Sequence, residues 1–266
     1  MNDSVSHDQI MAARAYEGLL VPALFQQWPD RVLAAVQLEP GQRVLDVACG
    51  TGVLGREAAL RVGPTGFVAG VDPDPGMLAV ARELAPAVEW RQGSAESLPY
   101  PDHTFDVVVS QFGLMVFSDR ARSVREMFRV LVPGGTLGVV VWDRLENVPG
   151  YRIEVDLLER LAGQPAADAV RAPFALGDAE QLAALFEEAG VAVEVTTRTG
   201  TARFPSIRSM VEADLRGWLP VMGVVLEEQQ MERILQEAER ALGRYVNGDG
   251  QVVFDAPGHI ITGRRK

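Results

Sequence analysis

The chain has 266 residues, of which 47% are hydrophobic and 23% are charged. This length and composition predict a globular protein with a sizeable core and exclude a chain that is disordered throughout. Lys and Arg total 25 against 36 Asp and Glu, which gives a net charge of −11. Because affinity for nucleic acid depends largely on Lys and Arg neutralising phosphates, we expect neither a nucleic-acid partner nor an anionic membrane surface.

The sequence also bears on location and metal binding. The longest apolar stretches, 136–142 and 219–226, are far shorter than a membrane span, so we expect none. The first ten residues, MNDSVSHDQI, lack the basic and apolar regions of a secretory signal. With Cys49 as its one cysteine and with three histidines, the chain is expected to be cytoplasmic and to hold no metal. The basic run RRK at 264–266 is interpreted as a solvated tail.

The first half of the chain alternates between two periodicities. Residues 8–36 show the spacing of one or two helices, which Pro22 is expected to interrupt. From residue 42 onward, short runs of β-branched residues alternate with helical stretches, a pattern typical of a parallel sheet covered on both faces. The predicted strands are 42–48, 67–71, 88–91, 105–110 and 136–142, and the predicted helices are 53–61, 75–84 and 120–130.

After Trp142 the pattern is less regular. The expected helices are 145–161, 178–189, 206–218 and 227–245, and the expected strands are 191–197 and 251–261. The two late strands predict a pair that completes the sheet, with a helical insertion at about 205–247 between them. We therefore predict one domain over 1–266, comprising an N-terminal helical cap (1–36), a cofactor-binding core (40–143) and the completing strands with the insertion (144–266).

The strongest local signal is the segment VLDVACGTG at 44–52, where a strand enters a glycine turn that opens a helix. Such a turn lets a ligand approach the backbone, and the helix N-terminus offers free N–H groups. Residues 50–55 have the spacing G-x-G-x-x-G, and Asp72 lies 20 residues beyond Gly52. This spacing matches the dinucleotide-binding fingerprint, so an NAD(P)-dependent oxidoreductase is one interpretation.

The charge of the turn favours a different cofactor. Asp46 lies four residues before Gly50, and no Lys or Arg falls between residues 45 and 54. A carboxylate there repels a pyrophosphate and attracts a sulfonium or an ammonium group, by about 4 kcal/mol for charges about 4 Å apart at an effective dielectric constant of about 20. The sign favours S-adenosylmethionine if Asp46 points into the site; the alternative is that Asp46 caps the turn.

Four segments extend this interpretation: VLDVACGTG, AGVDPDPGMLAVAR, GSAESLPYPDHTFDVVVSQFGLMVF and EMFRVLVPGGTLGVVVW. Together they resemble the class I S-adenosylmethionine-dependent methyltransferases, and within them the bacterial type 11 group that includes ubiquinone/menaquinone C-methyltransferases. The resemblance covers about 40–143. It implies an α/β, Rossmann-like fold with seven mostly parallel strands, a reversed last strand, helices on both faces and a helical cap insertion. It also implies methyl transfer by in-line displacement to a small-molecule acceptor, with S-adenosyl-L-homocysteine as the product.

The resemblance assigns cofactor-binding roles residue by residue. The turn would hold the methionine part of the cofactor through Asp46, Ala48, Gly50, Thr51 and Gly52. The remaining implied contacts are Asp72 to the ribose, Pro73 and Met77 to the adenosine, Ser94 and Ala95 at the adenine edge, and Gln111 toward the methionine end. Two positions depart from the family pattern: Ala48 stands where many members have glycine, and Ser94 stands where Asp is usual. We therefore expect the contact to the adenine amino group to be weaker or to be made by the backbone.

Five side chains are candidates for the acceptor pocket: Tyr16, Phe112, Met115, Arg216 and Trp218. Each has a plainer interpretation, which is packing for Tyr16, Phe112 and Met115 and surface placement for Arg216. No side chain is assigned as a catalytic base. The methylated atom, the acceptor and the oligomeric state are not predicted, and a non-catalytic cofactor-binding protein stays an alternative.

The histidines are expected to play no catalytic part. His103 falls in a polar turn and should be exposed, and His7 lies near the start of the N-terminal helix. His259 comes late in the predicted final strand, which would place it at the edge of the sheet away from the cofactor. Cys49 is expected to be a small packed residue.

Overall fold

The computed structural model describes residues 5–266, which divide into two compact units. Of the described residues, the first unit comprises 5–141, Ala179–Thr197 and His259–Lys266, and the second comprises Trp142–Asp178 and Arg198–Gly258. The organisation as one domain with an insertion at about 205–247 stays a prediction. The second unit is larger than that insertion, because it also contains Trp142–Asp178.

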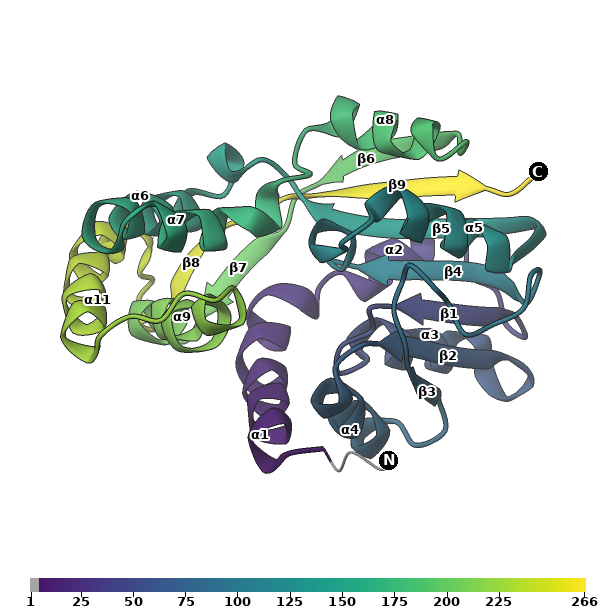
Figure 1. Cartoon of the computed structure of the whole chain (residues 1–266), viewed down its shortest axis with the longest axis horizontal. Helices are drawn as coiled ribbons and strands as arrows, with labels where there is room; N and C mark the ends of the chain where they lie inside the picture. Colours follow the sequence, from purple (N-terminus) through teal and green to yellow (C-terminus); the bar gives the residue numbers. More distant parts are fainter. Residues whose placement is uncertain (1–4) are drawn as a thin grey trace. The chain divides into compact units, whose positions relative to one another are not determined.

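A seven-stranded sheet forms the centre of the first unit, in the order β3-β2-β1-β4-β5-β9-β6 (Figure 1). Its strands are β1 (Arg43–Val47), β2 (Phe67–Asp72), β3 (Glu89–Gln92), β4 (Phe105–Gln111), β5 (Leu131–Trp142), β6 (Val193–Arg198) and β9 (Gly258–Arg264). β1 pairs in parallel with β2 and β4, β2 with β3, and β4 with β5. Most side chains of β1, β2 and β4 are buried, as expected of strands covered on both faces.

The last strand runs against the others. The Asp143 N–H donates to the Pro257 carbonyl at 3.0 Å, and at the opposite end of the pair the Arg265 N–H donates to the Gly135 carbonyl at 2.9 Å. The end of β5 therefore pairs with the start of β9, so β9 is antiparallel to β5, as the arrows in Figure 1 show. The predicted mostly parallel sheet with a reversed last strand is confirmed.

The predicted strand 251–261 is not one continuous strand. The run 251–261 contains two strands, β8 (Val252–Asp255) and β9, separated at Pro257, which has no N–H to donate. β8 belongs to the second unit, where it pairs antiparallel with β7 (Thr201–Phe204), a strand that was not predicted. The residues after Pro257 return to the main sheet between β5 and β6, which confirms that two late strands complete it.

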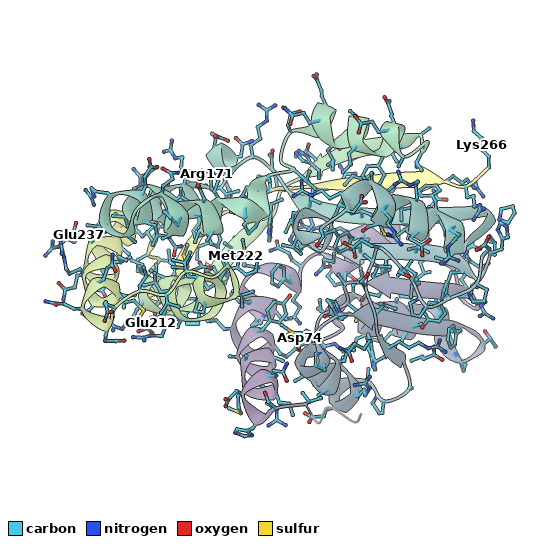
Figure 2. The ribbon with its side chains drawn as sticks, viewed as in Figure 1. Asp74, Arg171, Glu212, Met222, Glu237 and Lys266 are labelled. Atoms are coloured by element: carbon cyan, nitrogen blue, oxygen red, sulfur yellow. The ribbon has the colours of Figure 1, made fainter. Side chains whose placement is uncertain are left out.

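Helices cover both faces of the sheet, with α5 on one face and α2 and α3 on the other (Figure 1). The helices of the first unit are α1 (His7–Ala15), η1 (Tyr16–Phe25), α2 (Pro29–Ala35), α3 (Val53–Val62), η2 (Gly63–Thr65), α4 (Pro75–Leu84), η3 (Leu114–Val116), α5 (Arg120–Val130) and α8 (Ala179–Glu188). The helix α4 begins where the Asp74 carboxylate accepts the Gly76 and Met77 N–H groups, at 2.6 and 3.2 Å (Figure 2). The helix α1 lies beside α4, and an added Cβ at Gly76 would lie 2.6 Å from the Gln9 carbonyl oxygen.

The prediction that Pro22 interrupts the N-terminal helical segment was wrong. Residues Tyr16–Phe25 form a π-helix, η1, whose characteristic hydrogen bond joins an N–H to the carbonyl five residues earlier, as in Gln26 N–H to the Val21 carbonyl at 2.8 Å. The wider turn continues past Pro22, which has no N–H of its own to bond. The π-helix therefore carries the chain from α1 toward α2 without a break.

The second unit is mainly helical. Its elements besides β7 and β8 are η4 (Leu145–Asn147), α6 (Pro149–Ala162), α7 (Gln164–Arg171), η5 (Ala172–Phe174), α9 (Ile207–Glu212), η6 (Ala213–Trp218), α10 (Leu219–Val221), α11 (Glu228–Leu242) and η7 (Gly243–Tyr245). The predicted helix 145–161 is two elements because Pro149 starts a new helix. The helix α7 was missed, since it follows α6 directly after Gly163, whose φ is +88°.

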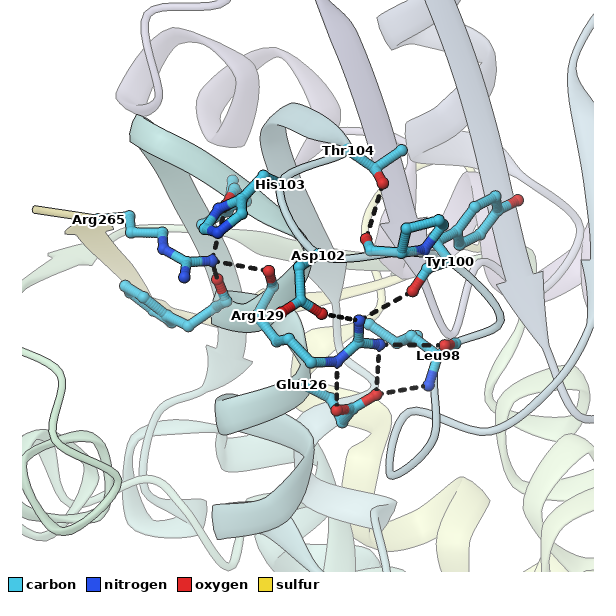
Figure 3. Close-up of polar contacts among 11 residues, drawn as sticks. Leu98, Tyr100, Asp102, His103, Thr104, Glu126, Arg129 and Arg265 are labelled. Atoms are coloured by element: carbon cyan, nitrogen blue, oxygen red, sulfur yellow. Dashed lines mark hydrogen bonds and ion pairs between the residues drawn. The ribbon is translucent and has the colours of Figure 1, made fainter.

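The interpretation of the basic run 264–266 as a solvated tail was wrong for Arg265. The Arg265 guanidinium donates to the carbonyls of Phe128, Arg129 and Leu131 at 2.5, 2.7 and 2.7 Å (Figure 3). These carbonyls lie at the end of α5, where the helix leaves them without an internal partner. Arg265 therefore caps α5 with a positive charge, which the helix dipole favours.

In the part of the chain that the structure describes, no helix combines the length and the apolar character needed to cross a membrane.

Candidate functional site

The glycine turn follows β1 at the carboxyl edge of the sheet. Its glycines Gly50 and Gly52 have φ values of +54° and +85°, and Ala48 has +57°, a conformation that glycine adopts more readily. The Asp46 carboxyl is 1% exposed, and its Oδ2 accepts the Gly55 N–H at 2.9 Å in the first turn of α3. Its Oδ1 is buried and has no hydrogen-bond partner among the described residues. Burial raises the pKa of Asp46 to about 8.

A tryptophan that the sequence interpretation missed explains the glycine spacing. Asp46, Gly70 and Trp90 lie in register across β1, β2 and β3, and Trp90 is 6% exposed. An added Cβ would lie 2.3 Å from the indole at Gly70, 2.4 Å at Gly52 and 3.0 Å at Gly55. The indole therefore occupies the space that three side chains would need. Two glycines of the G-x-G-x-x-G spacing are required here by packing within the protein itself.

Asp72 connects the turn to the start of α4. Its Oδ2 accepts the Gly50 N–H at 2.8 Å, and its Oδ1 accepts the Asp74 N–H at 2.9 Å. Burial raises the pKa of Asp72 even though both hydrogen bonds act to lower it. The Asp46 and Asp72 carboxyls thus lie at the ends of neighbouring strands, close enough for the charge of Asp72 to raise the pKa of Asp46 as well.

Aromatic rings gather at the same edge of the sheet. Tyr16 stacks on Phe25 with ring centroids 5.5 Å apart, Phe25 contacts Phe112 at 5.4 Å, and Phe112 meets Trp28 edge-on at 5.5 Å. Burial and the nearby acidic groups, Asp72 foremost among them, raise the pKa of Tyr16. Phe25 and Trp28 were not predicted, since nothing in their spacing separates them from packed helix residues.

The end of β4 adds a second unpartnered oxygen. The Gln111 Nε2 donates to the Phe25 carbonyl at 3.3 Å, whereas its buried Oε1 has no hydrogen-bond partner among the described residues. The next residue, Phe112, has a φ of +55°, so the chain turns sharply after the strand. Met115 is buried, and its carbonyl accepts the Arg120 guanidinium at 2.8 Å.

The remaining cofactor candidates follow β2 and β3. Pro73 is exposed, Met77 is half-buried at the start of α4, and Ala95 is buried. Ser94 is exposed and lies beside Glu96, to whose carboxylate it hydrogen-bonds. Their roles toward a cofactor stay predictions.

Two acceptor candidates belong to the second unit. The Arg216 guanidinium pairs with the Glu228 carboxylate at 2.9 and 2.5 Å, and its side chain is 45% exposed. The Trp218 Nε1 donates to the Ala169 carbonyl at 2.7 Å, which joins η6 to α7. The polar groups of both side chains therefore have partners within this unit.

The position predicted for His259 was wrong. Because the strand 251–261 is split at Pro257, His259 is the second residue of β9 rather than a late one. It lies at the end of β9 that pairs with the end of β5, which is the carboxyl edge of the sheet. Its side chain is 4% exposed, and its Nδ1 is 3.0 Å from the Thr197 hydroxyl. His103 is exposed, as predicted, and so is His7.

The second unit contains a buried acidic pair that the sequence interpretation missed. Glu154 on α6 is 0% exposed, and beyond the contact between the two carboxyls neither of its oxygens nor the Oδ2 of Asp214 has a hydrogen-bond partner among the described residues. Burial and the charge of Asp214 raise the pKa of Glu154, and burial raises that of Asp214 to about 7. The raised pKa values favour a pair in which one carboxyl keeps its proton and shares it with the other near neutral pH.

Known protein families match a segment of the first unit. A family model described as a methyltransferase domain matches residues 44–135, which include the glycine turn, Asp72 and Gln111. Residues 44–135 are therefore similar to a methyltransferase domain. The match gives no support to the NAD(P)-dependent oxidoreductase that the G-x-G-x-x-G spacing also suggested.

Curated relatives match the same region. The demethylmenaquinone methyltransferase of Listeria welshimeri is 37% identical over 134 residues, which cover 48% of this chain and 56% of the relative. The ubiquinone/menaquinone biosynthesis C-methyltransferase of Ectopseudomonas mendocina is 40% identical over 135 residues, covering 48% of this chain and 53% of the relative. The chain thus spans about half the length of the curated relatives it matches.

A solved structure extends the likeness of the fold to most of the chain. The structure of a putative methyltransferase from an antibiotic biosynthesis pathway of Anabaena variabilis has a TM-score of 0.64 and 19% identity to the chain. The alignment covers 88% of this chain and 96% of that structure. At this identity the comparison shows the fold, which agrees with the class I methyltransferase sheet of the first unit.

Proposed function

We propose that this protein is an enzyme that transfers a methyl group from S-adenosylmethionine to a small-molecule acceptor by in-line displacement. The observation that carries the proposal is a buried carboxyl, Asp46, near the end of β1 and beside the glycine turn, in a segment that matches a methyltransferase domain. One oxygen of this carboxyl has no hydrogen-bond partner among the described residues. A second unpartnered oxygen, Gln111 Oε1, lies at the end of β4. Buried acceptor atoms normally have partners, so two without one fit a ligand that brings N–H groups or positive charge.

The proposed contacts follow from these positions. Asp46 and the turn residues Ala48, Gly50, Thr51 and Gly52 would hold the methionine part, and Gln111 would face it. Asp72, which already fixes the Gly50 N–H, would also accept the ribose hydroxyls. Pro73, Met77, Ser94 and Ala95 would surround the adenosine.

Most of the catalysis would be positioning. When bound, S-adenosylmethionine supplies a methyl group on a positively charged sulfur atom. The rings of Tyr16, Phe25 and Phe112 would exclude water from the carboxyl edge and hold the acceptor against it. No side chain is assigned as a base, and one is needed only where the acceptor must lose a proton.

The acceptor is proposed to be a small molecule, and the two curated relatives are methyltransferases of quinone biosynthesis by name. Met115, Arg216 and Trp218 stay acceptor candidates. The net charge of −11 supports the absence of a nucleic-acid partner. The cytoplasmic location stays a prediction.

Ligand-dependent stability and methyl transfer together test the proposal. We expect S-adenosylhomocysteine at about 100 times its Kd to stabilise the protein by about 2.7 kcal/mol, and NADH to have no effect. Methyl transfer from isotope-labelled S-adenosylmethionine to a small-metabolite extract, followed by mass spectrometry, then identifies the acceptor. Stabilisation by NADH alone, or by neither ligand, would refute the proposal.

The buried carboxyl of Asp46 makes cofactor binding depend on pH. Its pKa of about 8 leaves it mainly protonated at pH 6.5, and a bound cation favours the carboxylate, so a proton must leave on binding. The Kd of S-adenosylmethionine, measured by calorimetry, is therefore expected to fall about tenfold between pH 6.5 and pH 8.5.

Asp46→Asn should bind more weakly at pH 8.5 and lose this dependence. The matched control is Asp30→Asn, which removes a 78%-exposed carboxylate of the same unit and should behave as the wild type. An unchanged pH dependence in Asp46→Asn would show that Asp46 does not hold the cation.

A further inference from the structure

One carboxylate fastens the N-terminal π-helix to the glycine turn. Glu17, the second residue of η1, accepts the Thr51 hydroxyl at its Oε2, 2.5 Å away, and the Arg56 guanidinium at its Oε1, 2.7 Å away. Thr51 is 1% exposed in the middle of the turn, and Arg56 lies in α3, directly after it. The side chains of Glu17 and Arg56 are 22% and 24% exposed, so water screens their ion pair less than it screens a surface pair.

The same π-helix is attached at its other end. Tyr16 stands over the turn, because an added Cβ at Gly50 would lie 4.0 Å from its Cε1 and from its hydroxyl oxygen. At the end of η1, the Phe25 carbonyl accepts the Gln111 amide at 3.3 Å. The segment Tyr16–Phe25 therefore connects the turn after β1 with the end of β4. Asp46 on β1 and Gln111 on β4 each have an oxygen without a hydrogen-bond partner among the described residues.

The contact from Glu17 adds a constraint on the glycine turn that the strands of the sheet do not supply. The sheet side of the turn is fixed by Asp72, which holds the Gly50 N–H, and by the Cys49 carbonyl, which accepts the Gly52 N–H at 2.8 Å. The Thr51 hydroxyl between them donates to Glu17 on η1, so its orientation depends on this carboxylate. Without Glu17 the Thr51 hydroxyl and the guanidinium of Arg56 both lose the partner that orients them.

We propose that Glu17 is a positioning residue for the cofactor. Glu17 holds Thr51 and the glycine turn in the geometry that receives the methionine part of the cofactor. Through this contact the N-terminal helical segment becomes part of the binding site. This inference rests on the proposed function. Glu17 acts through Thr51 and Arg56 rather than on the reacting atoms. Its loss should therefore raise the KM for S-adenosylmethionine and leave kcat nearly unchanged.

Calorimetric binding of S-adenosylhomocysteine to the full-length protein tests the inference. Glu17→Ala and Thr51→Val each break the same link, so each should raise the Kd about tenfold, and the double variant should be no weaker than either single one. Glu17→Gln keeps an oxygen for the Thr51 hydroxyl but loses the charge that pairs with Arg56, so about threefold is expected. Thr51→Ser keeps the hydroxyl and should bind within about twofold of the wild type.

A matched control separates positioning from general stability. Glu83→Gln weakens the Arg14–Glu83 pair, which joins α1 to α4 with both side chains 54% exposed, and should leave the Kd unchanged. Hydrogen exchange provides a second readout: ligand should slow exchange in His7–Phe25 of the wild type and not of Glu17→Ala.

The outcomes distinguish the inference from the proposed function. If the wild type binds and Glu17→Ala and Thr51→Val bind equally well, Glu17 is structural and the inference is overturned. Additive losses in the double variant would overturn it too, because the two residues would then act separately. If the wild type does not bind at all, the proposed function fails and the inference fails with it.

Discussion

Trp90→Ala is expected to cost about 4 kcal/mol of the free energy of unfolding, in the middle of the range for removing a buried tryptophan. The indole is 6% exposed, fills the space beside Gly52, Gly55 and Gly70, and donates from its Nε1 to the Ala85 carbonyl at 2.9 Å. Its removal leaves a cavity beneath the glycine turn. Urea denaturation of the full chain, monitored by circular dichroism, measures the loss, and Trp90→Phe should lose less.

A double-mutant cycle tests whether the indole is what requires the glycine. Gly70→Ala places a Cβ 2.3 Å from the ring and should cost about 2 kcal/mol or more in the wild type. In the Trp90→Ala background the same change should cost less, because the ring is then absent and the Cys49 Sγ, 3.0 Å from the added Cβ, is the remaining close neighbour among the three nearest atoms. The control is Gly243→Ala, since among the described residues no atom beyond the glycine's own backbone neighbours lies within 4 Å of the added Cβ there. Additive effects of Gly70→Ala and Trp90→Ala would contradict this account of the spacing.

The acidic pair of the second unit is expected to make that unit less stable as the pH rises. Both folded-state pKa values are raised, Asp214 to about 7, above the ordinary value near 4 of an unfolded chain. The folded state therefore binds more protons than the unfolded state between about pH 4 and pH 7, and the free energy of unfolding falls as the pH rises through this range.

The double variant Glu154→Gln, Asp214→Asn removes both titrations and should be more stable than the wild type, with a difference that grows from pH 5 to pH 8. Hydrogen exchange of the amides in α6 and η6 measures this locally, which separates it from the titrations of Asp46 and Asp72 in the first unit. Glu159→Gln on the same helix is the control, because Glu159 is 51% exposed and should change little. A difference that does not vary with pH would show that the pair does not share a proton.

The sequence by itself determined the parallel part of the sheet and the similarity to methyltransferases. The runs of β-branched residues at β1, β2 and β4, and the glycine turn between β1 and α3, depend on local periodicity and on backbone conformations that few residues adopt. Such features are encoded within about ten neighbouring residues, so α4 and α5 occupy the predicted residues 75–84 and 120–130. The four motifs identified the methyltransferase domain for the same reason.

Only the tertiary structure decided which distant side chains meet. Trp90 follows Gly70 by 20 residues, yet strand register places its ring against the glycines. Glu17 reaches Thr51 across 34 residues, and Asp214 reaches Glu154 across 60, although no pattern in the sequence connects either pair. Arg265 looked like part of a free tail until the pairing of β9 with β5 brought it to the end of α5. Hydrogen bonds and packing between elements depend on the register and crossing of whole elements, and those are set by the assembled core rather than by any local segment.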